Sequence, residues 1–235
     1  KWVDEIIVVD SGSVDKTVQI AQEHGARIVK VEWCGFGASK QAGVDAATGE
    51  WILSIDADEV IPDILTDEIK AELLKSDNEA VGYYIPRTTQ FLGRWIRHGG
   101  WYPDYVLRLF RRGSGGFDSA LVHETVKVNG PTVKLKNALE HYSYPDLDSY
   151  FNKLNRYTTL AAQDLHRQGC TAGLFKILIN PVAKFLKQYC LRGGWLDGLE
   201  GLILALLSAG YVMTKYAKLR DLNRRAAEEG HERST

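Results

Sequence analysis

Apolar residues in the first sixty positions alternate between short runs of strand length and longer amphipathic stretches. Residues 4–9 and 26–31 are β-branched runs that predict strands, and residues 13–24 between them carry a helical pattern. A second helix is expected from the Gly-rich segment at 35–41 to about residue 47. The chain therefore begins as β-α-β, the pattern of an open α/β sheet whose ligands bind at the carboxyl ends of its strands.

The most informative stretch is the apolar run at 51–55, which ends in Asp56, Ala57 and Asp58. A buried parallel strand that ends at a ligand site has this pattern. In an extended segment residues i and i+2 point to the same side, so Asp56 and Asp58 are expected to face one cation. Carboxylate oxygens bind hard metals, so the stretch predicts a Mg²⁺ or Mn²⁺ site beside a phosphate, with a plain strand-end turn as the alternative.

From residue 146 the pattern changes to helices, expected over 147–165 and 174–189 and followed by the uncharged apolar stretch 201–214. That stretch is shorter than the about 20 residues of a bilayer span. Residues 153–225 contain twelve Lys or Arg and four Asp or Glu, which favours a basic helical hairpin in the membrane interface. A helical cap over the sheet or a dimer face is the alternative.

Three regions are therefore expected: a catalytic domain at 1–145, a basic amphipathic helical region at 146–225 and a disordered polar tail at 226–235. A net charge of −1 over 235 residues gives no electrostatic case for binding nucleic acid. The three cysteines, Cys34, Cys170 and Cys190, are widely spaced. They indicate a reducing compartment and argue against a disulfide framework or a zinc site.

Several motifs, taken in order, resemble a known family. They are Val-Asp-Ser-Gly-Ser at 9–13, Gly-Phe-Gly-Ala-Ser-Lys-Gln at 35–41, Trp-Ile-Leu-Ser-Ile-Asp-Ala-Asp-Glu at 51–59, His-Gly-Gly-Trp-Tyr-Pro-Asp at 98–104, Val-His-Glu at 122–124 and His-Tyr-Ser-Tyr at 141–144. This set is similar to family 2 glycosyltransferases of the GT-A fold, in the branch that includes bacterial lipopolysaccharide-core glucosyltransferases. The resemblance covers nearly the whole chain. It implies an α/β, Rossmann-like, mostly parallel sheet with a C-terminal helical extension.

The resemblance also implies a further strand ahead of residues 4–9, which in family members helps to seat the nucleotide base. A sheet without that strand is expected to have an exposed hydrophobic edge. We therefore expect the 235 residues, without that strand, to be less than fully active.

The activity implied by the resemblance is the inverting, metal-dependent transfer of a hexose, expected to be glucose, from a nucleotide sugar, expected to be a UDP-sugar. The acceptor would be the lipopolysaccharide core or another membrane-associated glycan or lipid, so the protein is expected to be peripheral on the cytoplasmic face of the bacterial inner membrane. One alternative is a nucleotidyltransferase, although the sequence shows no basic Gly-rich triphosphate loop. The other is a non-catalytic membrane-binding or partner-binding module on an inactive GT-A fold.

Negative charge develops on the diphosphate as it leaves, so the site needs a cation. Asp56 and Asp58 are expected to hold that cation, with Asp58 as the closer ligand. The donor-binding residues are expected to be Asp10, Ser11, Lys40, Asp56 and Arg108. An Asx-turn is the alternative for Asp10, and a solvated helix lysine is the alternative for Lys40.

The resemblance assigns the base that accepts the proton of the acceptor hydroxyl to Glu124, with Asp104 as second choice. An ordinary exposed strand glutamate is the alternative for Glu124. His123 would orient a phosphate or the base, or would be a half-buried structural histidine. His141 is expected to be a further metal ligand, with a structural role as the alternative.

Residues 95–104 are too rich in Gly and aromatic residues to be regular structure. Aromatic faces flanked by polar groups bind sugar rings, so this segment is expected to form the acceptor wall or lid. The acceptor-binding residues are expected to be Trp95, His98, Trp101 and Tyr102. Packing against the core is the alternative for these side chains.

Overall fold

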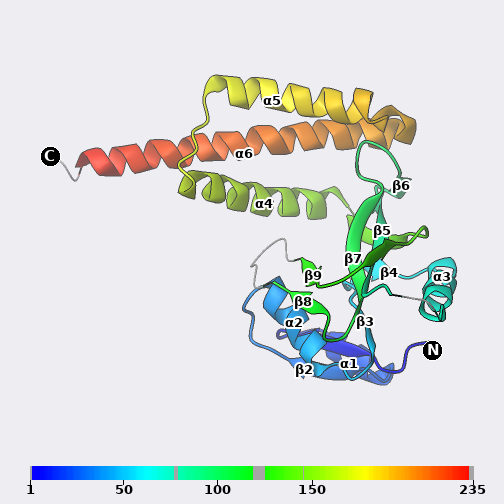
Figure 1. Ribbon diagram of the computed structural model, residues 1–235. Coiled ribbons are helices and arrows are strands. Elements are labelled where there is room, and N and C mark those ends of the chain that lie inside the picture. Colours follow the sequence, from blue (N-terminus) through cyan, green and yellow to red (C-terminus); the bar gives the residue numbers. More distant parts are fainter. Residues whose placement is uncertain (1, 77–78, 119–124, 145, 233–235) are drawn as a thin grey trace. The chain divides into compact units, whose positions relative to one another are not determined.

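The computed structural model describes residues 2–76, 79–118, 125–144 and 146–232, with side chains to residue 228 (Figure 1). The chain divides into two compact units, and each is built from two separate segments. Residues 1–87 and 105–139 form the first unit, and residues 88–104 and 140–235 form the second. The expected boundary at residue 145 therefore differs from the structural one, because the segment expected to bind the acceptor belongs to the second unit.

The first unit is an α/β structure. Its elements, in chain order, are β1 (Ile7–Asp10), α1 (Thr17–Glu23), β2 (Arg27–Lys30), α2 (Phe36–Ala46), β3 (Trp51–Leu53), β4 (Glu59–Val60), α3 (Asp63–Leu73), β5 (Gly82–Phe91), β7 (Asp104–Arg111), β8 (Gly115–Phe117), β9 (Val126–Val128) and β10 (Thr132–Lys134). Strands β1 and β2 pair in parallel, with Ile7 opposite Arg27. The expected β-α-β start of the chain is confirmed.

Strand β3 differs from expectation in both length and pairing. It covers only Trp51–Leu53, its residues are half-buried, and it pairs antiparallel with β7, with Ile52 opposite Phe110. The sheet is therefore mixed at this point. The direction of pairing was not predictable from the strand itself, because its partner lies more than fifty residues away in the chain. In the described ranges β1 and β2 form a sheet of their own, so β1 and β3 each have one edge without a strand partner.

The core of the first unit lies between α3 and the strands β5 and β7. Leu65 and Ile69 of α3 are fully buried against Tyr83 and Ile85 of β5 and Leu109 of β7. Both β5 and β7 have side chains buried on both faces. This places the charged side chain of Arg108, in the middle of β7, inside the protein.

The second unit is mainly helical. It contains the end of β5, then β6 (Arg94–Ile96), β11 (Leu139–Tyr144), α4 (Leu147–Arg167), α5 (Leu174–Leu186), a π-helical turn (Lys187–Leu191), a 3₁₀ turn (Gly194–Asp197) and α6 (Gly198–Glu232). Figure 1 shows α4 and α5 on opposite sides of the long α6, and each of them packs against it. The helices expected at 147–165 and 174–189 are confirmed. The side chain of Asp146 caps α4 by accepting a hydrogen bond from the Ser149 N–H at 2.7 Å.

Helix α6 is much longer than the apolar stretch 201–214. Its charged C-terminal half is stabilised by ion pairs one turn apart, Arg224 with Asp221 and with Glu228. The helix therefore continues through residues 226–232, where a disordered tail was expected. The stretch Gly194–Glu228 is long and apolar enough to cross a membrane by length and composition, and 28% of its most apolar window is buried.

Candidate functional site

The two aspartates at 56 and 58 lie in a turn and not on an extended strand. After β3 ends at Leu53, residues 57–58 form a turn that is closed by a hydrogen bond from the Glu59 N–H to the Asp56 carbonyl, 3.0 Å. The Glu59 carboxylate in turn accepts from the Asp56 N–H at 2.9 Å. The expectation that strand geometry aligns Asp56 with Asp58 is therefore wrong, since this local hydrogen bonding bends the chain between them.

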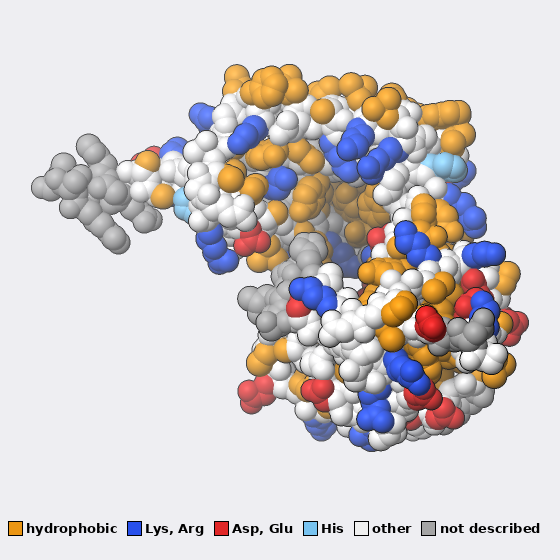
Figure 2. All heavy atoms as spheres, in the orientation of Figure 1, with side chains coloured by type: hydrophobic (Ala, Val, Ile, Leu, Met, Phe, Trp, Pro, Cys, Tyr) orange, Lys and Arg blue, Asp and Glu red, His pale blue; other side chains and the backbone are white. Residues whose placement is uncertain are grey.

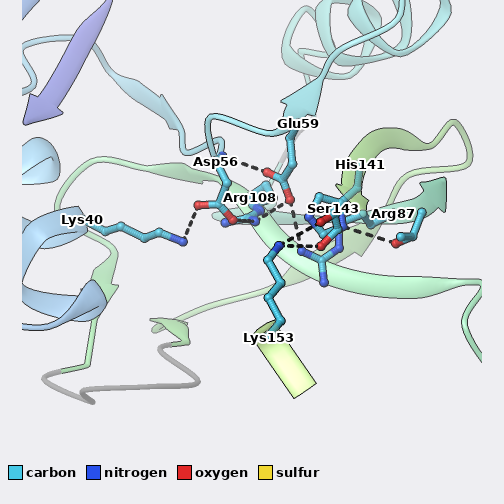
Figure 3. Close-up of polar contacts among 9 residues, drawn as sticks. Lys40, Asp56, Glu59, Arg87, Arg108, His141, Ser143 and Lys153 are labelled. Atoms are coloured by element: carbon cyan, nitrogen blue, oxygen red, sulfur yellow. Dashed lines mark hydrogen bonds and ion pairs between the residues drawn. The ribbon is translucent and has the colours of Figure 1, made fainter. Parts of the chain in front are cut away.

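A cluster of opposite charges surrounds this turn. Arg108 donates from Nη2 to Glu59 Oε1 at 2.6 Å and also to Asp56 Oδ2. Lys40 Nζ lies 2.6 Å from Asp56 Oδ1, and Arg87 Nη1 lies 3.2 Å from Glu59 Oε1. Figure 3 shows Lys40 and Arg108 both directed at Asp56. Lys40 comes from α2, Asp56 from the turn after β3, and Arg108 from β7. Three of the expected donor-binding residues thus meet at one point.

Burial alone raises the pKa of Asp56. The charge of Arg108 and the hydrogen bond and charge of Lys40 outweigh this effect, so the pKa of Asp56 lies below its ordinary value. Asp56 is therefore ionised at neutral pH. The Nε of Arg108 is buried and has no hydrogen-bond partner within the described residues, so this guanidinium keeps unused donor capacity.

The Gly-Gly-Phe motif at 115–117 lies against Gln41, in the middle of α2. A side chain at Gly115 would collide with the Lys127 carbonyl of β9, because its Cβ would lie 1.9 Å from that oxygen. A Cβ at Gly116 would lie 2.5 Å from Gln41 Oε1, so the glycine leaves room for the Phe117 N–H to donate to that oxygen at 2.8 Å. Lys40 Nζ lies 5.7 Å from the centre of the Phe117 ring. The motif thus positions the neighbouring Lys40.

Asp10 and Ser11 lie at the carboxyl end of β1. Asp10 is buried and accepts hydrogen bonds from the Gly12 and Ser13 N–H groups at 3.2 and 3.1 Å. The hydrogen bonds from Ser13 hold the pKa of Asp10 below its ordinary value. These contacts form the Asx-turn that was the alternative for Asp10. Asp10 and Ser11 also line a cavity of about 630 Å³ together with Lys30.

The expected metal ligands Asp56, Asp58 and His141 lie in different surroundings. Among the residues that the structure describes, no group of three or more His, Cys, Asp and Glu side chains could hold a metal ion. Both carboxylate oxygens of Asp56 have a cationic partner, and Asp58 is half-buried in the turn. His141, in β11, faces Thr89, with 3.3 Å between Nδ1 and Oγ1.

The expected catalytic residues fall on different parts of the chain. Glu124 and His123 lie outside the described residues, so the structure does not test them. The flanking residues Asp118 and Thr125 are joined by hydrogen bonds, including one of 3.0 Å from the Thr125 hydroxyl to the Asp118 carboxylate. Asp104, the second choice as base, is half-buried at the start of β7.

Among the expected acceptor-binding residues, Trp95 is in β6 and not in irregular structure, and its ring contacts Tyr142 edge to face. Trp101 and Tyr102 are half-buried in the Gly-rich segment, where Trp101 lies 6.1 Å from the Tyr144 ring. His98 Nδ1 lies 2.9 Å from the carboxylate of Asp197.

Asp197 is a residue that the sequence did not indicate. Its side chain is almost completely buried and also accepts hydrogen bonds from the N–H groups of Arg97 (3.2 Å) and His98 (2.8 Å). Glu59 was quoted in the sequence only as the last residue of the motif at 51–59, yet it organises the charged cluster. Neither role has a local pattern, because the partners lie far away in the chain.

Comparison with known proteins gives the class. Residues 3–141 match the family model described as Glycosyl transferase family 2. The lipopolysaccharide core biosynthesis glycosyltransferase LpsC of Rhizobium meliloti (strain 1021) is 32% identical over an alignment of 227 residues, and the match covers 92% of this chain and 82% of that protein. The chain therefore belongs to glycosyltransferase family 2. The resemblance, the α/β GT-A fold class and the enzyme class expected from the sequence are confirmed.

Two further relatives are more distant. The uncharacterized glycosyltransferase RP128 of Rickettsia prowazekii (strain Madrid E) is 28% identical over 94% of this chain and 79% of its own. The crystal structure of S. aureus TarS 1–349 in complex with UDP-GlcNAc has a TM-score of 0.45 and 13% identity, and the match covers 94% of this chain and 83% of that one. The family assignment rests on the sequence matches alone.

Proposed function

We propose that this glycosyltransferase moves a hexose, expected to be glucose, from a UDP-sugar to the lipopolysaccharide core or a related membrane-associated glycan or lipid, with inversion. The observation that carries the proposal is the meeting of Lys40, Asp56 and Arg108 in a family 2 domain. The name of the LpsC relative, 32% identical, supports the acceptor class.

In this reaction the acceptor hydroxyl oxygen forms a bond to the anomeric carbon while the bond from that carbon to the diphosphate oxygen breaks. The hydroxyl proton passes to the carboxylate of Glu124, or of Asp104 as second candidate. The electron pair of the broken bond leaves with the diphosphate, and the cations Lys40 and Arg108 are suited to offset its charge. Asp56 holds both cations in place. Asp10 and Ser11 are the candidates for contact with the base or ribose.

Asp58 and Asp56 are the residues that would hold Mg²⁺ or Mn²⁺. Mg²⁺ is commonly bound by one or two carboxylates together with substrate phosphates and water. The two carboxylates therefore fit an ion that binds with the diphosphate, although Asp56 would have to share its oxygens with Lys40. Such an ion supplies further positive charge to the leaving group. His141 remains a candidate for an additional ligand.

Thermal unfolding with UDP, with and without Mn²⁺, tests the donor site. At a UDP concentration of 100 times Kd, binding stabilises the protein by about 2.7 kcal/mol, which corresponds to a rise in Tm of roughly 5–10 °C for a chain of this size. Asp58→Asn should remove the Mn²⁺-dependent part of the rise. Asp67→Asn, an exposed aspartate on α3, is the matched control and should retain it.

The donor site is refuted if UDP gives no rise in Tm either with or without Mn²⁺. The metal assignment fails if Asp58→Asn and Asp67→Asn respond equally to Mn²⁺. For the base, Glu124→Gln should lower the rate of sugar transfer by orders of magnitude while the rise in Tm with UDP persists. Loss of that rise would instead place Glu124 in the donor site.

We also propose that the helical unit binds the cytoplasmic face of the inner membrane through α5. One face of this helix exposes large apolar side chains: Leu174, Phe175, Leu178, Ile179, Val182 and Leu186. Figure 2 shows hydrophobic side chains gathered over α5, with Lys and Arg side chains beside them. An apolar face bordered by cations suits an anionic membrane interface.

Cosedimentation with phosphatidylglycerol vesicles tests this surface. Full burial of one such side chain contributes about 1.5–3 kcal/mol, so Leu178→Asp should weaken vesicle binding at least tenfold. Val14→Asp, which changes a fully exposed apolar residue of the first unit, is the control and should bind as the unchanged protein does. Equal binding of the two variants would favour a capping or dimer role for α5.

A further inference from the structure

The second unit contains a cavity of about 290 Å³ that lies near the lower end of the roughly 300–1,000 Å³ typical of small-molecule sites. Trp101, Tyr144 and Tyr157 line it from three different parts of the unit, and Tyr211 and Ser208 line it from α6. This volume suits one sugar ring. Aromatic faces at such a site bind the C–H faces of sugars.

Two cations, Lys153 of α4 and Lys184 of α5, complete the lining, which includes no Asp or Glu among the described residues. Lys153 Nζ donates to the Ser143 carbonyl and hydroxyl, both at 3.0 Å. Burial lowers the pKa of Lys184, and the nearby charges of Arg192 and Lys187 add to this effect. Lys184 and the two cations near it, Arg192 and Lys187, therefore give this side of the cavity a positive charge, which suits an anionic ligand.

The tyrosines of the cavity supply hydroxyl groups. Burial, and then the neighbouring Tyr144 and Tyr211, raise the pKa of Tyr150, and burial followed by Tyr157 raises the pKa of Tyr211. Both phenols are therefore neutral at physiological pH and able to donate hydrogen bonds. Neutral hydroxyls, aromatic faces and two cations together match the surface of a sugar that carries an acidic group.

We propose that this cavity binds an acidic sugar residue of the acceptor glycan, with Lys153 and Lys184 on its carboxylate or phosphate and the aromatic side chains on its ring. The identification of the ligand as part of the acceptor rests on the proposed function. The cavity would select acceptors that carry an acidic sugar.

Isothermal titration of the full chain with four soluble probes tests the proposal: glucose, glucuronate, glucose 6-phosphate and glycerol 3-phosphate. A hydrogen bond to a charged group contributes about 1.5–3 kcal/mol, so at least one acidic sugar should bind about tenfold or more tighter than glucose. If glucuronate binds more tightly, the acidic group of the ligand is a carboxylate. If glucose 6-phosphate binds more tightly, it is a phosphate. The proposal is overturned if glucose binds as tightly as both acidic sugars. It is also overturned if glycerol 3-phosphate binds as tightly as the acidic sugars, because that result would indicate a site for a lipid headgroup.

Lys184→Gln should weaken binding of the preferred acidic sugar by about tenfold, and Lys184→Arg should restore it. Lys187→Gln is the matched control, because it removes one exposed charge three residues away and does not line the cavity. Equal effects of Lys184→Gln and Lys187→Gln would overturn the proposal. The titrations contain no nucleotide, so failure of the donor site in the UDP experiment and failure of this cavity are separate results.

Discussion

Replacing Glu59 by Gln removes one charge from the centre of the first unit and leaves the shape of the side chain almost unchanged. The Glu59 side chain is completely buried and contacts Arg108, Arg87 and the Asp56 N–H. A glutamine amide has one oxygen and one NH₂ group. If its oxygen faces the two arginines, its NH₂ faces the Asp56 N–H, so at least one buried donor loses its acceptor.

The expected loss of stability follows from these contacts. Removing one partner of a buried ion pair destabilises a protein by about 3–5 kcal/mol. Arg108 keeps its contact with Asp56, and the Arg87 side chain is 22% exposed and partly solvated. We therefore expect the lower end, about 3 kcal/mol, which is a large part of the roughly 5–15 kcal/mol that stabilises a typical domain.

Urea unfolding and amide hydrogen exchange measure this effect. Exchange at the β3 and β7 amides reports on the first unit even if the two units unfold separately. Glu50→Gln is the matched control: Glu50 also pairs with an arginine, Arg111, but the two side chains are 65% and 53% exposed. Exposed pairs contribute little, so the control should change exchange and midpoint only slightly. If both variants have the same effect, the charge of Glu59 is not what holds Arg108.

Two further predictions concern other parts of the chain. Hydrogen bonds from the Thr48 and Gly49 backbone lower the pKa of Glu5 from 4.5 to about 2, so the stability that its charge contributes is present above pH 4.5 and is lost as the pH falls toward 2. The difference in urea midpoint between unchanged protein and Glu5→Gln should therefore be largest near neutral pH and shrink over that window, and a constant difference would contradict the reasoning. Asp197→Asn should destabilise the second unit by about 2 kcal/mol and speed hydrogen exchange at Arg97 and His98, since their acceptor loses its charge; unchanged exchange at these two amides would show that Asp197 does not hold the segment.

Local patterns in the sequence predicted the elements and part of the site. The apolar periodicity at 147–165 gave α4, which runs Leu147–Arg167, because burial of one helical face is a local property of the sequence. Lys40, Asp56 and Arg108 were expected near the donor, and they do meet, although their roles remain proposals. The antiparallel pairing of β3 and the role of Asp197 were not predictable in this way. Both depend on partners about 60 and 100 residues away, and local spacing carries no information on such contacts.

The second unit has apolar surface that stays exposed while the ribosome is still making the chain, because its packing partners lie far apart in the sequence. Phe91 and Ile96 are buried against Tyr150 and Leu204, so part of their apolar surface stays uncovered until α6 has been synthesised. About 100 residues separate Ile96 from Leu204, which at about 5–20 residues per second corresponds to roughly 5–20 s of elongation. During that interval the nascent chain presents an unburied strand and aromatic segment, the kind of surface that chaperones bind. Slower translation of residues 105–204 should therefore lower the yield of folded protein.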